Sequence, residues 1–145
     1  MVPELRTARL VLRAFRPEDL AAFTAFARGD DYRRYLGAEH PAVDEFVANN
    51  VGRDGAWVIE HDGVVVGSVF LGDDGELACL LDPAHWNAGI ATEAAGAVVD
   101  HAFGAPGRDE VWATADAGNI ASIRAMARLG MTPAADGTYR RRRDG

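Results

Sequence analysis

One segment of the chain joins a strand, a turn and a helix start in a way that suits anion binding. Residues 76–81 have the pattern of a strand, and after an Asp-Pro stop a helix is predicted from about Gly89 to Phe103. The first turn of a helix has backbone N–H groups without partners and a partial positive charge. Gly89 and the small side chains of Ala88 and Ala91 would let a phosphate approach this backbone closely. The alternative is an ordinary connection in which the glycine only eases the turn.

Two helices are predicted in the first part of the chain, after a strand over residues 9–13. Pro17-Glu18-Asp19 opens the first helix, because proline suits the first helical position and acids suit the positive end of the helix dipole. The stripe that this helix buries is expected to be Leu20, Phe23 and Ala27. A second helix is expected over Val43–Val51.

An antiparallel meander is predicted in the centre of the chain. Its strands cover residues 56–60, 64–71 and 76–81. Asp62-Gly63 and Asp73-Asp74-Gly75 supply the positive φ angles that tight turns between such strands require.

The C-terminal part is predicted to form a strand over 110–115, a helix from Asn119 to Leu129 and a last edge strand over 138–142. Gly130 supplies the left-handed residue that ends the helix. The order of elements predicts one domain over residues 1–145, of the α/β class, with helices on the faces of a mixed sheet.

The charge distribution argues against a nucleic-acid partner. The 145 residues include 22 Asp and Glu against 15 basic residues, all of them arginine, and the formal net charge is −7. A nucleic-acid footprint needs clustered basic residues over a face of the fold. The run Arg140–Arg143 is expected to be an exposed edge or tail, and RNA contact by this run is the alternative.

The cysteine count and the hydropathy pattern favour a cytoplasmic protein without a membrane span. Cys79 is the one cysteine, so no intramolecular disulfide is possible, and it is expected to be a small apolar core residue. No apolar run approaches the roughly 18 residues of a membrane span. No cluster of His, Asp and Glu has the spacing of metal ligands, so no metal is expected.

Three stretches carry motifs in a shared order: residues 5–14 with the following Pro-Glu-Asp, residues 76–94, and residues 119–131. Together they resemble the GNAT N-acetyltransferases, in particular the ribosomal-protein (RimJ/RimL-like) branch. The first stretch is similar to the opening strand and helix of that branch. The second is similar to its acetyl-CoA-binding motif, and the third to its closing motif.

The resemblance implies the GNAT fold and direct transfer of an acetyl group from acetyl-CoA to a primary amine. The central, mostly antiparallel sheet would be splayed between the strands at 76–81 and 110–115, with the pantetheine arm in the opening. A strand N–H at Leu80 or Leu81 would polarise the thioester carbonyl. The pyrophosphate would lie on the backbone of Asn87, Ala88, Gly89, Ile90, Ala91 and Thr92.

The last helix is expected to contribute to the coenzyme site as well. Asn119 and Ser122 match the closing motif and are also suited to capping the helix, so both roles stay open. Arg124 and Arg128 share one helix face and could meet the phosphate end of the coenzyme, or could be solvated surface arginines.

The sequence departs from the family pattern at three positions. Asn87 stands where the family has glycine, and Ala88 where it commonly has Arg, Lys or Gln. Ala88 therefore removes a side-chain donor to the phosphates. Met126 stands where many members have a tyrosine that protonates the leaving thiolate, so a water or the Ser122 hydroxyl is expected to act there instead.

An alkyl amine is mostly protonated at neutral pH, so acetyl transfer needs a general base. Glu76 is the first candidate, because it begins the motif strand and matches a glutamate common in the resembled branch. His85 is the second, because histidine titrates near neutral pH. The alternatives are a solvated carboxylate and an ordinary loop histidine.

A catalytically idle acyl-CoA-binding module is the competing hypothesis, motivated by Ala88 and Met126. The acceptor, a protein N-terminus or a small amine, stays open, and both monomer and homodimer fit the sequence. The excess of acid suits an amine that arrives protonated, whereas the polyanionic coenzyme must be bound by local donors.

Overall fold

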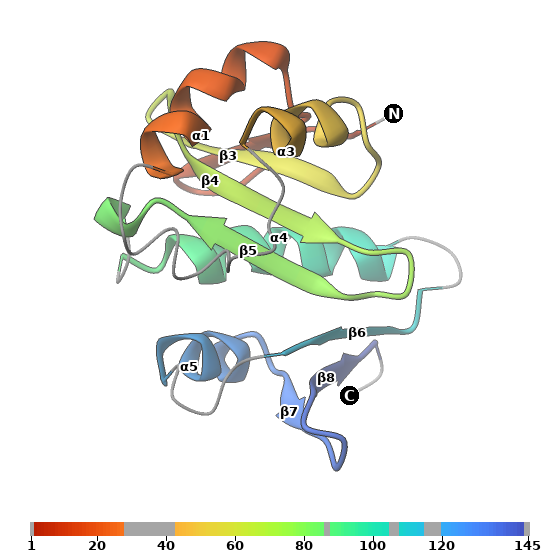
Figure 1. Ribbon diagram of the computed structural model, residues 1–145. Helices are drawn as coiled ribbons and strands as arrows, with labels where there is room; N and C mark the ends of the chain where they lie inside the picture. Colours follow the sequence, from red (N-terminus) through yellow and green to blue (C-terminus); the bar gives the residue numbers. More distant parts are fainter. Residues whose placement is uncertain (1, 28–42, 86–87, 105–107, 115–119, 144–145) are drawn as a thin grey trace.

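The computed structural model describes residues 2–27, 43–85, 88–104, 108–114 and 120–143. Its strands form an antiparallel five-stranded sheet in the order β1-β2-β3-β4-β5 and a three-stranded sheet in the order β6-β8-β7 (Figure 1). The strands of the first sheet are β1 (Leu5–Arg6), β2 (Leu10–Arg13), β3 (Ala56–His61), β4 (Val64–Leu71) and β5 (Leu77–Leu81). Those of the second are β6 (Glu110–Ala113), β7 (Thr132–Pro133) and β8 (Tyr139–Arg142). The mixed α/β class expected from the sequence is confirmed.

Helices cover both faces of the larger sheet. Helix α1 (Leu20–Ala27) follows a short 3-10 turn, η1 (Pro17–Asp19), and lies beside α3 (Val43–Asn50) on one face (Figure 1). Helix α4 (Ile90–Gly104) packs on the other face, behind β5, and is reached through a second 3-10 turn, η2 (Pro83–His85). Helix α5 (Ile120–Arg128) lies beside β6. No helix in these described ranges is long and apolar enough to cross a membrane.

The predicted hairpin turns of the meander are confirmed. Asp62 and Gly63 have φ angles of 53° and 78°, as a two-residue turn with two left-handed residues requires. Gly75 has a φ of 93° in the following turn. Local sequence therefore fixes the antiparallel order β3-β4-β5.

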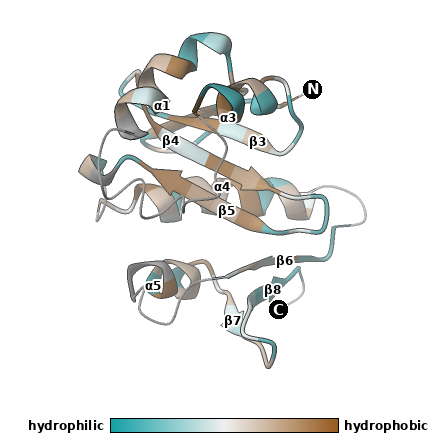
Figure 2. Cartoon of the chain, viewed as in Figure 1, coloured by the Kyte–Doolittle hydropathy of each residue, from teal (hydrophilic) through white to brown (hydrophobic). Residues whose placement is uncertain are grey.

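Each face of the larger sheet has its own apolar core. The larger core lies under α4 and includes Trp57, Ile59 and Val98, all at most 1% exposed. The smaller core lies under α1 and α3 and contains stacked and edge-on phenylalanines, with ring centroids 5.5–6.0 Å apart. Its aromatic members are Phe15, Phe23, Phe46 and Phe70. The hydrophobic colour that runs along β4 and β5 marks the layer shared by both cores (Figure 2).

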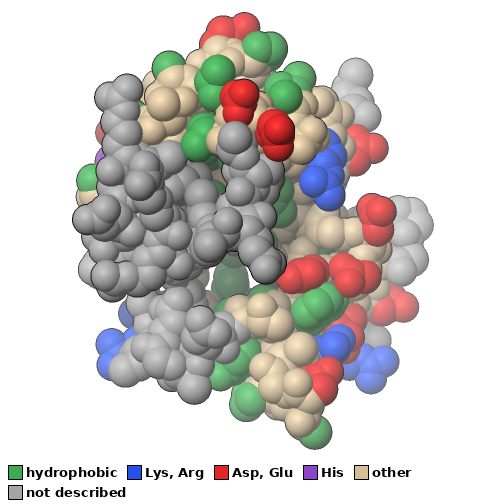
Figure 3. All heavy atoms as spheres, in the orientation of Figure 1, with side chains coloured by type: hydrophobic (Ala, Val, Ile, Leu, Met, Phe, Trp, Pro, Cys, Tyr) green, Lys and Arg blue, Asp and Glu red, His purple; other side chains and the backbone are tan. Residues whose placement is uncertain are grey.

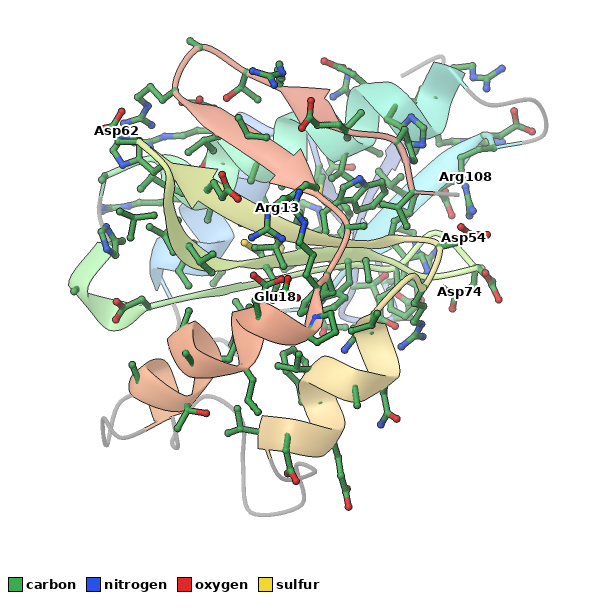
Figure 4. All side chains as sticks on the ribbon, turned by 90° about the horizontal axis from the view of Figure 1, so that it is seen from above. Arg13, Glu18, Asp54, Asp62, Asp74 and Arg108 are labelled. Atoms are coloured by element: carbon green, nitrogen blue, oxygen red, sulfur yellow. The ribbon has the colours of Figure 1, made fainter. Side chains whose placement is uncertain are left out.

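A buried ion pair attaches the start of α1 to the sheet. The Arg13 guanidinium on β2 donates to both carboxylate oxygens of Asp19, at 3.0 and 2.8 Å, and also to Glu60 on β3. Asp19 in turn accepts from the Arg16 backbone N–H at 2.8 Å, which caps the turn. The hydrogen bond with Asp19 raises the pKa of Arg13 above its ordinary value, against the opposing effect of burial. Figure 4 labels Arg13 and Glu18, where the sheet and the helix start meet.

The predicted buried stripe of the first helix is wrong at Leu20. Phe23 is fully buried, whereas Leu20 is 38% exposed. The side chain of Ala27 lies outside the described residues. Asp19 takes the place expected for Leu20 on the buried face: it precedes Phe23 by four residues, is 4% exposed and is held inward by its ion pair with Arg13.

The prediction that residues 138–142 form an edge strand is also wrong. Strand β8 is the middle strand of its sheet and pairs with both β6 and β7. Arg140 makes ion pairs with Glu110 and Asp136, at 2.7 and 3.3 Å, and lies over the Trp112 ring. Arg141 donates to the Leu129 carbonyl at 3.0 Å. The arginine run was expected to be an exposed edge or tail, but its first three residues are built into this sheet.

Replacing Asp19 by alanine should lower the free energy of unfolding by about 3 kcal/mol, because it leaves the buried Arg13 charge only partly compensated. Urea unfolding of the variant measures this loss. Glu18→Ala is the matched control, because Glu18 is exposed in the same turn, and it should change stability by about 0.5 kcal/mol or less. Equal stability of the two variants would contradict the structural role of the ion pair.

Candidate active site

In the described part of the chain, strand pairing between the two sheets is limited to one bridge. Glu76 and Trp112 form an isolated parallel bridge, and the Trp112 backbone N–H donates to the Gly75 carbonyl at 3.0 Å. The indole N–H of Trp112 donates to the Asp74 carbonyl at 3.2 Å. A Cβ on Gly75 would lie 2.6 Å from the Glu110 carbonyl oxygen, so this close approach requires glycine. Beyond the bridge, β5 and β6 share no ladder in the described part of the chain, which confirms the expected splay.

Backbone groups of β5 alternate between its two edges, as in any strand. The Asp82 N–H donates to the Val66 carbonyl, and the Gly72 N–H donates to the Glu76 carbonyl, both at 2.8 Å. Even-numbered residues from 76 to 82 therefore direct their backbone groups to β4 and its flanking turn.

This alternation separates the two residues expected at the thioester. Leu80 belongs to the even-numbered set and is paired with Ser68 of β4. Leu81 and Cys79 direct their backbone groups to the other edge of β5, on the side where β5 has left β6. The backbones of the two candidate residues therefore point to different edges of the strand.

The start of α4 lies past the open end of β5. Gly89 has a φ of 75° and its carbonyl accepts the first helical hydrogen bond, from the Glu93 N–H at 3.0 Å. The N–H groups of Ile90, Ala91 and Thr92 precede that bond and so have no partner within the helix. Ile90 is 1% exposed and anchors the turn in the core, whereas Gly89 is exposed. Ala88 is also exposed, and Asn87 lies outside the described residues.

The two candidate bases lie at opposite ends of β5. Glu76 is exposed at the closed end of the splay, beside Trp112. His85 lies in η2 at the open end, with its Nε2 3.9 Å from the Asp82 carboxylate. Glu76 and Leu80 are four residues apart, so they share a face but lie about 13 Å apart along the strand. Glu76 could therefore reach an amine near the opening only through water.

Acidic side chains gather around the closed end of the splay. Asp73, Asp74 and Glu76 are all exposed in or next to the β4–β5 turn. Figure 3 shows carboxylates on the side of the molecule where this turn meets the second sheet. The Arg108 guanidinium donates to the Asp73 carbonyl at 3.1 Å, so the turn carries a positive charge as well. The described residues contain no group of three or more His, Cys, Asp or Glu that could hold a metal ion.

Helix α5 ends in a Schellman motif, and Met126, which takes part in it, is buried in the core. The Met131 N–H donates to the Met126 carbonyl and the Gly130 N–H to the Ala127 carbonyl, both at 3.0 Å. Gly130 has the required left-handed φ of 78°. The side chains of Met126 and Met131 are 8% and 4% exposed and lie in the core under α4.

The remaining predicted residues of this region are only partly described. Arg124 and Arg128 are exposed on α5. Asn119 lies outside the described residues, and so does the side chain of Ser122. Cys79 is partly exposed and packs against the core under α4, where burial raises the pKa of its thiol to about 12. A thiol of this kind is a poor nucleophile, in agreement with its expected role as an apolar residue.

A cluster that the sequence did not indicate joins α4 to the β1–β2 turn. It consists of Thr7, Arg9 and Glu93 and is here called the Glu93 clamp. Glu93 Oε1 accepts from Arg9 Nε at 2.7 Å. Glu93 Oε2 accepts from the Arg9 backbone N–H at 3.0 Å and from the Thr7 hydroxyl. Burial opposes ionisation of Glu93, but these hydrogen bonds outweigh it and lower its pKa. No local pattern indicates the clamp, because its members lie more than 80 positions apart in sequence.

Known proteins share this architecture. A family model described as an acetyltransferase (GNAT) domain matches residues 9–132. The uncharacterized N-acetyltransferase YoaA of Bacillus subtilis is 28% identical over an alignment of 147 positions, gaps included, which covers 90% of this chain and 83% of YoaA. A GNAT-family acetyltransferase from Bacillus anthracis matches 99% of this chain and 100% of its own, with a TM-score of 0.86 and 20% identity.

A structure of Mycobacterium smegmatis RimJ in complex with CoA-disulfide matches 97% of this chain and 86% of its own, with a TM-score of 0.78 and 19% identity. At this identity the likeness shows the fold alone. The family match, by contrast, spans most of the chain and includes both strands of the splay and helix α4. The chain therefore belongs to the GNAT acetyltransferase family.

Proposed function

We propose that this protein transfers an acetyl group from acetyl-CoA directly to a primary amine, either the α-amine of a protein N-terminus or the amine of a small molecule. The observation that carries the proposal is the splay of β5 from β6, together with the first turn of α4, whose N–H groups have no partner within the helix. The first offers backbone groups to an amide-containing arm, and the second offers backbone donors to phosphates.

The coenzyme site is proposed to rest mainly on backbone groups. A strand N–H at Leu80 or Leu81 is proposed to polarise the thioester carbonyl, and the pairing of β5 with β4 holds both residues in register. Asn87 to Thr92 cradle the diphosphate, with Gly89 permitting close approach. Asn119, Ser122 and Arg124 from the last helix complete the proposed contacts with the coenzyme arm.

The chemistry needs a neutral amine, whose nitrogen bonds to the acetyl carbon while the carbon–sulfur bond breaks. Glu76 is proposed to take the amine proton through water, because its carboxylate shares a strand face with Leu80. His85 is the alternative base, at the other end of β5. The thiolate takes its proton from water or from the Ser122 hydroxyl, since Met126 is buried in the core.

We further propose that the chain is one RimJ/RimL-like domain over residues 1–145, acting in the cytoplasm as a monomer or homodimer. The support is the order of its three motifs. Neither nucleic acid, nor a membrane, nor a metal is part of the proposal. The exposed carboxylates near Glu76 suit an acceptor that arrives as a cation.

A catalytically idle acyl-CoA-binding module is the second candidate. Two observations favour it. The exposed side chain of Ala88 has no hydrogen-bond donor for the phosphates, and the buried side chain of Met126 has no acidic proton for the thiolate. Both functions require coenzyme binding, so they differ only in turnover.

Release of free thiol from acetyl-CoA in a broad panel of amines separates the two functions. We expect amine-dependent release with at least one acceptor, and mass spectrometry should find one acetyl group added to that amine. Binding of acetyl-CoA without release above background would establish the idle module instead.

Replacing Glu76 by glutamine should lower kcat at least about tenfold with little change in the Kd of the coenzyme, because it removes a base without touching the phosphate site. Steady-state kinetics and calorimetry measure the two constants. Asp73→Asn removes a neighbouring exposed carboxylate and should leave both unchanged. Unchanged turnover in Glu76→Gln, with a loss in His85→Asn, would transfer the role of base to His85.

Replacing Gly89 by glutamate should raise the Kd of coenzyme A at least about tenfold, because the new carboxylate crowds and repels the diphosphate. Gly137→Glu is the matched control, since Gly137 is exposed, has a φ of 85° and has open space around it. It carries the same backbone strain and charge away from the site. A normal Kd in Gly89→Glu would refute the position of the diphosphate at α4.

A further inference from the structure

A carboxylate in the first turns of α4 poses a problem for a site that must receive phosphates. Glu93 follows the unpaired N–H groups of residues 90–92 directly. The negative charge of an acid at such a position interacts favourably with the positive end of the helix dipole. The acid therefore competes with any second anion for that end. A diphosphate nearby would also be repelled by the carboxylate charge.

The Glu93 clamp removes this competition. Both carboxylate oxygens accept hydrogen bonds from the β1–β2 turn, Oε1 from the Arg9 side chain and Oε2 from Thr7 and the Arg9 backbone. The carboxylate is thereby held by Thr7 and Arg9, and the ion pair with Arg9 offsets its charge. The N–H groups of the first turn stay available for another anion.

Arg9 holds Glu93 with only one end of its guanidinium. The Nε atom donates to Glu93, and Nη2 lies on the side of Gly89, where a Cβ would be 3.5 Å away from it. The Arg9 side chain is 42% exposed, so its outer nitrogens are open to solvent. Among the hydrogen bonds of the described residues, none is donated by Nη1 or Nη2 of Arg9. A guanidinium with free outer N–H groups beside the helix start is suited to a phosphate oxygen.

The Arg9 guanidinium lies beside Gly89, next to a position whose side chain has no charge. Ala88 precedes Gly89 with an exposed methyl group, at the position where the family resemblance predicts a basic or amide side chain. Arg9 approaches the same glycine from a different part of the chain.

We propose that Arg9 binds a phosphate of the coenzyme diphosphate in place of the missing donor at Ala88, and that Glu93 is the positioning residue that holds Arg9 beside Gly89. The inference rests on the proposed function and adds a side chain to its coenzyme site. It concerns the diphosphate alone and not the acetyl-bearing arm.

The test compares two ligands that differ in the diphosphate. Arg9→Gln should raise the Kd of coenzyme A about tenfold, measured by calorimetry, and should leave the binding of S-acetylpantetheine unchanged in an NMR titration. Arg6→Gln removes a nearby exposed arginine that pairs with Glu4, and it should bind both ligands like the wild type. Weaker binding of both ligands by Arg9→Gln would show a purely structural role and overturn the inference.

Glu93→Gln in the Arg9→Gln background provides a second, independent readout. With Arg9 absent, the Glu93 carboxylate is uncompensated and repels the diphosphate, so the double variant should bind coenzyme A more tightly than Arg9→Gln. In the wild-type background the same Glu93→Gln change should weaken binding, because it releases Arg9. The same direction of change in both backgrounds would overturn the positioning role.

The two proposals fail in different ways. If the wild type binds coenzyme A and Arg9→Gln has the same Kd, only the role of Arg9 is lost. If the wild type binds no coenzyme A, the proposed function is lost together with it.

Discussion

Pairing between β5 and β6 stops after the single bridge at Glu76 and Trp112, and this constraint shapes the whole site. The backbone groups of even-numbered residues of β5 are used in pairing with β4, and those of odd-numbered residues point to the edge on the side of the splay. The bridge requires glycine at position 75, because a Cβ there would collide with the Glu110 carbonyl. The small sheet β6-β8-β7 holds β6 in this position, with Arg140 pairing across to Glu110.

The electrostatics follow from how the arginines are distributed. The protein carries a net charge of −7, so a polyanionic coenzyme cannot be attracted by the overall field. Three arginines stabilise the fold: Arg13 is buried against Asp19, and Arg140 and Arg141 stabilise the small sheet. Arg9 differs, because it neutralises one carboxylate and still presents its outer nitrogens beside Gly89.

The two cores have different consequences for the chemistry. The core under α4 fixes the helix start, since Ile90 is buried directly after exposed Gly89. The same core contains Met126, whose carbonyl accepts from the Met131 N–H in the Schellman motif of α5. The Met126 side chain therefore packs in the core. The core under α1 and α3 borders the opposite face of β5, the face that Leu80 shares with Glu76.

The sequence by itself determined the features that depend on neighbouring residues: the Asp62-Gly63 turn, the meander, the glycine at the start of α4 and the end of α5 at Gly130. It also carried the three motifs that indicate the family. Only the tertiary structure decided that β8 is a central strand, that the Leu80 backbone points to β4 and the Leu81 backbone to the other edge, and that Arg9 meets Glu93. These features depend on strand register and on contacts between residues far apart in the chain, and the local preferences of the residues do not encode either of them.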